Sequence, residues 1–424
     1  MFDEYTNERL VNLLNDRFEK INEELLEQIG KTIKKIGSLT PTQAHQLEYI
    51  LKYGGNYDNI VKKLEKLSLK SGVDIDKIFK QVAKNNQEFD ELFYEYRNIK
   101  QIPYEQNIAL QNQVNAIANI TKRSMFNIAS TTGFVIDKQF KPLDQTYYDL
   151  IDEAILKLSQ GKNTYQNAMR DTLKKLADSG IRTRITRDGI DTGERIVDYE
   201  SGYTRRLDSA IRMNLLDGIR EVSNETQREF AKEFNYDGIE ISVHINPAKD
   251  HEKVQGHQFS VVRPSENELS EWEKLQNGLI ATDYNGERLS LDHDRNGDYR
   301  KISTLNCYHY EFPIILGVSK PLYTKEELND INKNNHKGFI YEDKHYTNYE
   351  GTQLMRNIET EIRKQKDRNI IANASGDTEM ATESEKRIRL LRKRYKEISQ
   401  ISGLKEDIKR ARVSNYKRQS IKEA

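Results

Sequence analysis

The sequence predicts a mainly α fold with a helical N-terminal half, a small α+β central domain and a charged helical C-terminal tail. Two observations lead to this expectation. Only 36% of the 424 residues are hydrophobic and 32% are charged, which is typical of long solvated helices with few core positions. Apolar residues also recur three or four positions apart over most of the chain, whereas alternation with period two is confined to its middle.

The N-terminal region, residues 1–180, is expected to be all helical, because its apolar residues keep helical spacing between short turn signals. A first long amphipathic helix covers about residues 7–37. Thr40 and Pro41 supply a cap and a first-turn proline for the second helix, which Gly54 and Gly55 end. Further helices are expected at 58–69, 73–83, 110–125, 144–158 and 164–177.

The central region, residues 181–323, combines one long helix with short strands. The helix runs from Thr204 to Phe234, with apolar residues on one face and charged residues, including Arg206 and Arg228, on the other. After Gly238, residues 239–245 alternate apolar and polar, which predicts a half-buried strand. The loop that follows, residues 246–256, contains more His, Asp and Gln than a connector needs.

The last hundred residues are expected to form a polar connector, 324–350, and a basic helical tail, 351–424. The tail contains two charged helices, at 353–371 and 383–400, separated by a helix-breaking link. It has 19 Lys and Arg against 11 Asp and Glu, a local surplus of positive charge that makes it the candidate DNA-contacting region. The candidate contacts are Arg387, Arg389, Arg392, Lys393, Arg394, Lys409, Arg410 and Arg412.

Charge and cysteine content restrict the class of protein. Lys and Arg number 67, as do Asp and Glu, so the net charge gives no argument for nucleic acid or membrane binding. The single cysteine, Cys307, excludes an internal disulfide and fits a reducing compartment. The chain begins without the features of a signal peptide, and no apolar run reaches the roughly 18 residues of a membrane helix.

Short motifs around the central helix resemble those of the tailed-phage minor capsid protein family, portal-associated minor head proteins related to the Mu F-like head proteins. The motifs lie before the helix, at the end of the expected strand, in the polar loop and at residues 306–309. Tyr308 stands where the family usually has Arg. In order, the matching residues are Asp198, Tyr199, Ser201, Gly202, His244, Pro247, His251, Gln255, Gly256, Asn306, Cys307 and His309.

This resemblance implies a structural protein that binds and assembles without catalytic turnover. Its expected location is the virion head near the portal, after synthesis in the cytoplasm of a bacterial host. The implied partners are the portal protein and the major capsid protein, with double-stranded DNA as a third candidate. The resemblance implies no cofactor, no small-molecule substrate and no membrane span.

The histidines and the cysteine suggest an alternative, a Cys/His-based hydrolytic or DNA-handling enzyme. Cys307 beside a histidine provides a nucleophile and a base, but no oxyanion-hole signature accompanies them. The same Cys307, His309 and His251 are weak zinc candidates, because the spacing matches no known zinc finger. We therefore expect no metal there, and hydrogen bonds that fix the loop to the sheet instead.

Two further alternatives remain open. Residues 292–297 match the first half of a calcium-binding loop, but Ser303 stands where the twelfth position requires a bidentate Glu. A turn between strands explains the Asn-Gly in this segment equally well. A free cytosolic helical scaffold with no role in the virion is the other alternative.

Overall fold

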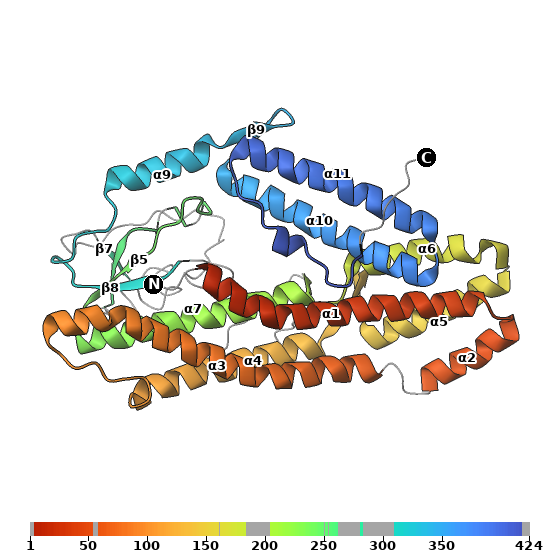
Figure 1. Ribbon diagram of the computed structural model, residues 1–424, viewed down its shortest axis with the longest axis horizontal. Helices are drawn as coiled ribbons and strands as arrows, with labels where there is room; N and C mark the ends of the chain where they lie inside the picture. Colours follow the sequence, from red (N-terminus) through yellow and green to blue (C-terminus); the bar gives the residue numbers. More distant parts are fainter. Residues whose placement is uncertain are drawn as a thin grey trace. The chain divides into compact units, whose positions relative to one another are not determined.

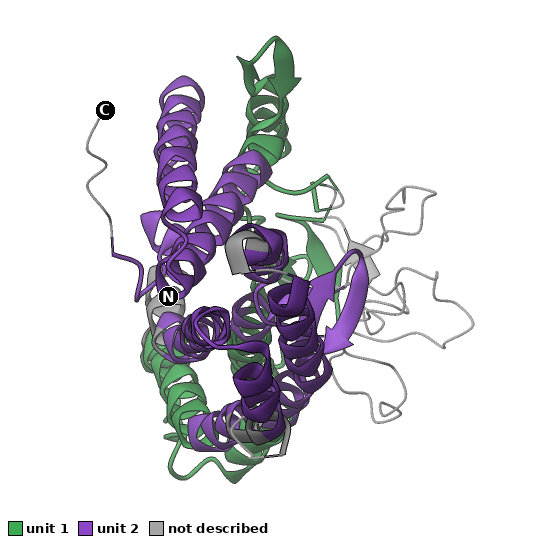
Figure 2. Cartoon of the chain, turned by 90° about the vertical axis from the view of Figure 1, so that its right-hand side faces the viewer, with its two compact units in different colours: residues 1–11, 72–121, 213–351 green, residues 12–71, 122–212, 352–424 purple. Residues whose placement is uncertain are grey.

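The computed structural model describes residues 4–53, 58–160, 162–183, 204–249, 251–252, 254–261, 280–282 and 309–417. Most of these residues are helical, which confirms the mainly α class (Figure 1). The chain forms two compact units (Figure 2): unit 1 contains residues 1–11, 72–121 and 213–351, and unit 2 contains residues 12–71, 122–212 and 352–424. Because each unit collects separate stretches, the four consecutive regions expected from the sequence stay a prediction.

Unit 1 is built around parts of three helices, α3 (Asp58–Arg97), α4 (Ile108–Ser130) and α7 (Leu207–Glu233). A methyl group on Gly218 of α7 would lie 2.4 Å from the Phe79 ring of α3, so a residue without a side chain allows the close approach. Farther along, the aromatic rings of Tyr94 and Phe230 pack edge to face at 5.6 Å.

The expectation of separate helices at 58–69 and 73–83 was wrong, because α3 is continuous over this stretch. Its apolar positions stay in phase: Leu64, Ile75 and Phe79 are all fully buried. Gly72, which lies between the two expected helices, costs a helix only about 1 kcal/mol relative to Ala. Burial of the apolar face on both sides of that glycine outweighs the cost.

Unit 1 also contains an antiparallel sheet in the order β7-β6-β5-β8. Its strands are β5 (Gly238–Ile241), β6 (Gln258–Ser260), β7 (Ile280–Thr282) and β8 (Glu311–Ile314). Ile239 lies opposite both Phe259 and Pro313, so β5 is a central strand. All four residues of β5 are buried, and the strand ends before the expected residue 245. Successive side chains of a strand point to opposite faces, so burial of all four means that both faces of β5 are covered.

The interval expected as a polar connector contains helix α9 (Lys325–Lys337) and a hairpin of β9 (Phe339–Tyr341) and β10 (Lys344–Tyr346). Thr324 and Glu327 form a reciprocal capping box at the start of α9. Asn335 is the only buried residue of this helix, so the sequence has no helical spacing of apolar residues from which α9 could be predicted.

Unit 2 consists mainly of long helices. They are most of α1 (Glu4–Gly37), with α2 (Pro41–Tyr53), α5 (Leu143–Gln160), α6 (Lys162–Ser179), α10 (Asn348–Ser375), α11 (Thr378–Ser402) and the short η2 (Ile408–Ala411). Helices α10 and α11 run side by side as an antiparallel pair (Figure 1), and the Asn369 amide donates to the Ala381 carbonyl at 3.1 Å. Ile388, Tyr395 and Ile398 form the buried face of α11, at the spacing that the sequence showed.

A small sheet in unit 2 has the order β2-β1-β3-β4, and its strands β1 and β2 lie in the region that was expected to be all helical. Its strands are β1 (Thr132–Ile136), β2 (Gln139–Pro142), β3 (Arg182–Thr183) and β4 (Arg205–Arg206). Asp137 and Lys138 connect β1 to β2 with positive φ angles of 50° and 67°. Two successive residues with positive φ are the geometry of a type I′ turn, for which the usual sequence is Asn-Gly.

No helix among the described residues is long and apolar enough to cross a membrane.

Candidate functional site

The loop after β5 folds back on the sheet of unit 1 through one glutamine. The Gln255 Oε1 accepts the backbone N–H of His244 at 2.9 Å and lies 3.3 Å from Nε2 of His309. Gln255 is only 1% exposed, so this carbonyl oxygen meets its partners away from bulk water. One side chain therefore links the chain just after β5 to the chain just before β8.

Three of the histidines singled out in the sequence come together at this point. The His244 and His309 rings are 4.5 Å apart at 82°, and the His251 and His309 rings are 4.9 Å apart at 86°. Rings nearly perpendicular to one another make edge-to-face contacts. His251 and His309 are also buried. The cluster has the packing and hydrogen bonds of a structural element that holds the loop against the sheet.

The same loop is fixed by a glycine and by helix α9. Gly256 has a φ of +69°, and a methyl group there would lie 2.6 Å from a Leu328 methyl of α9. The buried Asn335 amide of α9 donates to the Pro247 carbonyl at 3.2 Å and to Glu252 at 2.9 Å. Only glycine satisfies both the backbone angle and the space at position 256. Pro247 contributes its carbonyl as the acceptor for Asn335, so both motif residues have backbone roles in this loop.

Several of the motif residues lie outside the described part of the chain: Asp198, Tyr199, Ser201, Gly202, Asn306 and Cys307. The half-matched calcium loop at 292–303 lies outside it as well. Among the described residues, no group of three or more His, Cys, Asp or Glu is arranged to hold a metal ion. The zinc and hydrolase alternatives both require Cys307, so the geometry of the described residues does not address them.

Charged residues on the polar face of α7 are buried or half-buried, which the sequence pattern did not suggest. In unit 1, Arg228 donates to Glu311 of β8 from Nη2 at 2.9 Å and from Nε at 3.1 Å. Burial lowers the pKa of Arg228, but the Glu311 and Glu225 carboxylates together outweigh it and raise the pKa. The Asn224 amide donates to the same carboxylate at 3.3 Å. This ion pair fixes α7 to the edge strand β8.

A second buried ion network lies in unit 2. Arg206 donates to Asp367 at 2.9 Å and to Asp208 at 3.3 Å, and Arg363 donates to the other oxygen of Asp208. Burial raises the pKa of Asp208, but Arg363 and Arg206 together lower it to about 2. Burial and the Asp208 charge raise the pKa of the neighbouring Glu19 to about 8. Asp208 is therefore ionised, whereas the neighbouring Glu19 keeps its proton near neutral pH.

The candidate DNA contacts lie on α11 and on the segment around η2. Arg387, Arg392 and Lys393 are exposed on α11, and Lys409 and Arg412 are exposed on or beside η2. Arg389 and Arg394 are half-buried, and Arg410 pairs with Asp407 at 2.9 Å. The Asp407 N–H donates to the Tyr395 hydroxyl at 2.7 Å, which holds η2 against α11.

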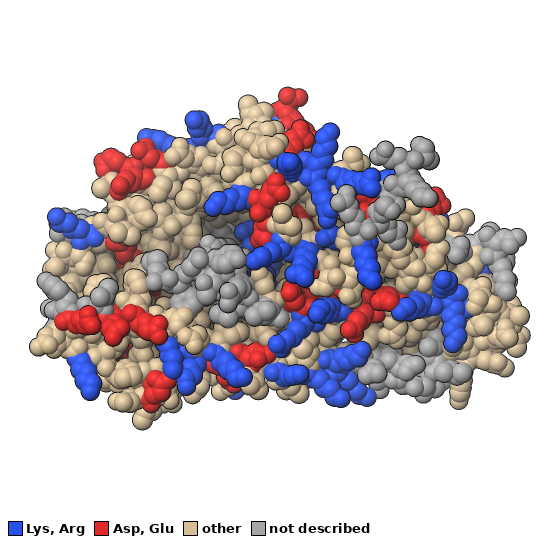
Figure 3. Space-filling model, viewed as in Figure 1, with Lys and Arg blue, Asp and Glu red and all other residues tan. Residues whose placement is uncertain are grey.

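Two cations that were not among the candidates share a face of α11 with two that were. Lys386 and Lys396 are exposed, and with Arg389 and Lys393 they recur three or four positions apart, so these four lie on one side of the helix. That spacing is visible in the sequence. Figure 3 shows blue side chains gathered over the position of α11, with red ones interspersed on the same face.

The chain is mainly helical, and buried polar side chains join elements that are far apart in the sequence. This is the architecture of a structural protein. The chain belongs to the family Phage minor capsid protein 2, whose family model matches residues 3–398. It is therefore a structural protein of the phage head, located in the virion and associated with other head components. No curated protein and no solved structure matches it.

Proposed function

We propose that this head protein sits near the portal, where it binds the portal protein and the major capsid protein during head assembly or genome delivery. It acts by binding, without catalytic turnover, after synthesis in the cytoplasm of its bacterial host. The observation that carries the proposal is the family match over residues 3–398, which includes most of both compact units. Structural head proteins work through their surfaces, so the relevant activity is association.

A second part of the proposal is a contact between the tail and packaged double-stranded DNA. It is supported by the exposed cations Arg387, Arg392 and Lys393, for which no carboxylate partner is present among the described residues. Cations without internal partners are available to neutralise DNA phosphates, and such contacts release bound counterions. This binding would not depend on base sequence, since phosphate contacts carry no sequence information.

Co-expression with the portal protein of the same genomic neighbourhood tests the first part. Size-exclusion chromatography with light scattering should show a defined complex that contains both proteins, and its mass would give their ratio. Each protein run alone is the control. Separate elution of the two, together with bound zinc or hydrolytic activity in the free protein, would instead support the Cys307-based enzyme.

A further inference from the structure

A groove in unit 2 has a composition suited to an anion. We call it the lysine groove; it lies between the last turns of α1, the last turns of α10 and residues 414–417, with a volume of about 970 Å³. Four lysines line it, Lys31, Lys34, Lys35 and Lys417, against one carboxylate, Glu27. The C-terminal segment thus contributes one cation to a wall made mostly by α1.

Most of that positive charge is not neutralised within the described chain. Lys31 pairs with Glu27 at 2.5 Å, one helical turn away. No ion pair joins Lys34, Lys35 or Lys417 to a carboxylate of any described residue. Three lysines without a carboxylate partner among the residues described give the lining of this groove a surplus of positive charge, which would attract an anion.

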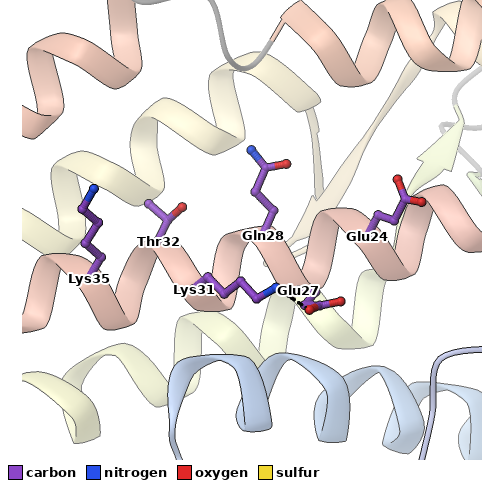
Figure 4. A pocket seen from close by; sticks show the side chains of 6 residues that line it. All are labelled: Glu24, Glu27, Gln28, Lys31, Thr32 and Lys35. Carbon is purple, nitrogen blue, oxygen red and sulfur yellow. Dashed lines mark hydrogen bonds and ion pairs between the residues drawn. The ribbon is translucent and has the colours of Figure 1, made fainter.

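A neighbouring hollow on the same helix shares Glu27, Lys31 and Lys35 with the groove but has no surplus of lysines over carboxylates. Figure 4 shows this second hollow, of about 410 Å³, lined only by residues of α1. Its lining contains as many carboxylates as lysines, but Glu27 pairs with Lys31, and Glu24 pairs with Lys63 at 3.4 Å. In Figure 4, Lys35 projects to a different side of α1 from the Lys31–Glu27 pair. The balanced hollow gives no reason to expect an anion.

The walls of the lysine groove are held in place. A methyl group on Gly30 would lie 2.6 Å from the Ala374 side chain, so α1 and α10 are in close contact at its floor. Glu23 accepts the backbone N–H groups of Ser414 and Asn415 at 2.6 and 2.7 Å, which fixes the C-terminal wall. A site with preformed walls loses little conformational entropy when a ligand binds.

The uncharged part of the lining decides which kind of anion fits. The described residues that line it offer amide and hydroxyl groups, including the exposed side chain of Asn415, and no aromatic ring. Single-stranded nucleic acids bind largely by stacking their bases on aromatic side chains, so this lining suits them poorly. A duplex presents its phosphates on a convex surface, which exposed cations such as those of α11 contact more readily than a recessed groove does. Carboxylates on an extended peptide can enter a groove and meet both the ammonium and the amide groups.

We propose that the lysine groove binds an extended, acidic peptide segment of a partner protein. Lys34, Lys35 and Lys417 contact its carboxylates, and the exposed Asn415 side chain hydrogen-bonds to its backbone. This site is separate from the candidate DNA contacts on α11. It does not rest on the proposals for the portal or for DNA, because it follows from the charge and shape of the groove alone.

The test uses the full chain and a fluorescein-labelled oligoglutamate peptide, with binding measured by fluorescence anisotropy at low ionic strength. The variant Lys34→Glu/Lys35→Glu/Lys417→Glu should bind the peptide at least about tenfold more weakly, since it reverses the groove charge. The matched control is Lys66→Glu/Lys70→Glu/Lys320→Glu, which reverses three exposed lysines elsewhere and should stay within about twofold.

Circular dichroism establishes that each variant is folded, and the neutral variant Lys34→Gln/Lys35→Gln/Lys417→Gln replaces the reversed one if that one does not fold. Equal weakening in the groove and control variants would overturn the proposal, because it would indicate attraction by net charge only. Failure of the unmodified protein to bind the peptide would overturn it as well. Weaker binding of duplex or single-stranded DNA by the groove variant, with peptide binding unchanged, would assign the groove to nucleic acid instead.

Discussion

At the scale of single residues, a few buried polar side chains connect segments that are far apart in the sequence. Gln255 joins the chain after β5 to His309 before β8. Glu19 on α1 lies beside the buried Asp208 and Arg363. Neither contact could be read from the sequence, because strand pairing and helix packing decide which of the many Gln, His and Glu residues meet.

Gln255→Ala should lower the free energy of unfolding by about 1–3 kcal/mol, because it leaves the His244 backbone N–H without its acceptor inside the protein. Urea denaturation followed by circular dichroism measures the change. Gln400→Ala, at an exposed position of α11, is the matched control and should stay within about 0.5 kcal/mol. Equal stabilities of the two variants would show that the Gln255 contact does not hold the loop.

Stability should fall as the pH rises from about 5 to 8, partly through Glu19. Its pKa is raised from 4.5 to about 8 in the folded chain, so the folded protein keeps a proton that the unfolded chain releases. Each such proton makes stability decrease by up to about 1.4 kcal/mol per pH unit over this range. Denaturation of Glu19→Gln at several pH values should show a flatter profile than the unmodified protein.

The control for this profile is Glu24→Gln, which removes an exposed carboxylate from the same helix and should leave the slope unchanged. A slope in Glu19→Gln as steep as in the unmodified protein would mean that Glu19 is ionised in the folded chain.

At the scale of elements, buried side chains of the helices hold the C-terminal segment, residues 403–417. Apart from η2, this segment has no regular secondary structure. The Glu23 carboxylate, fully buried on α1, accepts two backbone N–H groups from it. Lys366 donates to the Ala411 carbonyl, and the Tyr416 hydroxyl donates to Glu385. Contacts to α1, α10 and α11 therefore keep this segment against the helices of unit 2.

Glu23→Ala should free that segment while the helices stay folded. Hydrogen exchange measured by mass spectrometry should become faster over residues 404–417, and the free energy of unfolding should fall by about 2–3 kcal/mol. Glu397→Ala, at an exposed position, is the control and should change neither quantity. Unchanged exchange in Glu23→Ala would mean that other contacts suffice to hold the segment.

How well the sequence predicted the structure also differed between elements, for physical reasons. Helix α1, with a continuous apolar face, was predicted almost over its full length, whereas the helix expected at 383–400 missed the first five residues of α11. Helix α9 was missed because it buries only Asn335, and the β1–β2 hairpin was missed because its turn is Asp-Lys. The strand before His244 was predicted too long, since alternation continues beyond the point where β5 stops pairing.

At the scale of the whole molecule, zero net charge coexists with a basic tail, so any attraction to DNA must be regional. The tail proposal makes a quantitative prediction about Arg387, Arg392 and Lys393. Replacing all three by Ala should make the salt dependence of duplex binding shallower, by about 0.9 in the log–log slope for each phosphate that is no longer neutralised. The control Lys66→Ala/Lys70→Ala/Lys320→Ala should keep the original slope. Salt-insensitive DNA retention, or equal slopes in both variants, would count against the tail as the DNA-contacting region.

The central claim is that this structural head protein is located at the portal. Chemical cross-linking of lysines in purified phage heads, followed by mass spectrometry, tests it most directly, because it reports neighbours in the assembled particle. We expect cross-links from this chain to the portal protein, with further ones to the major capsid protein. Cross-links to the major capsid protein alone, in heads whose portal is itself efficiently cross-linked, would contradict the portal location.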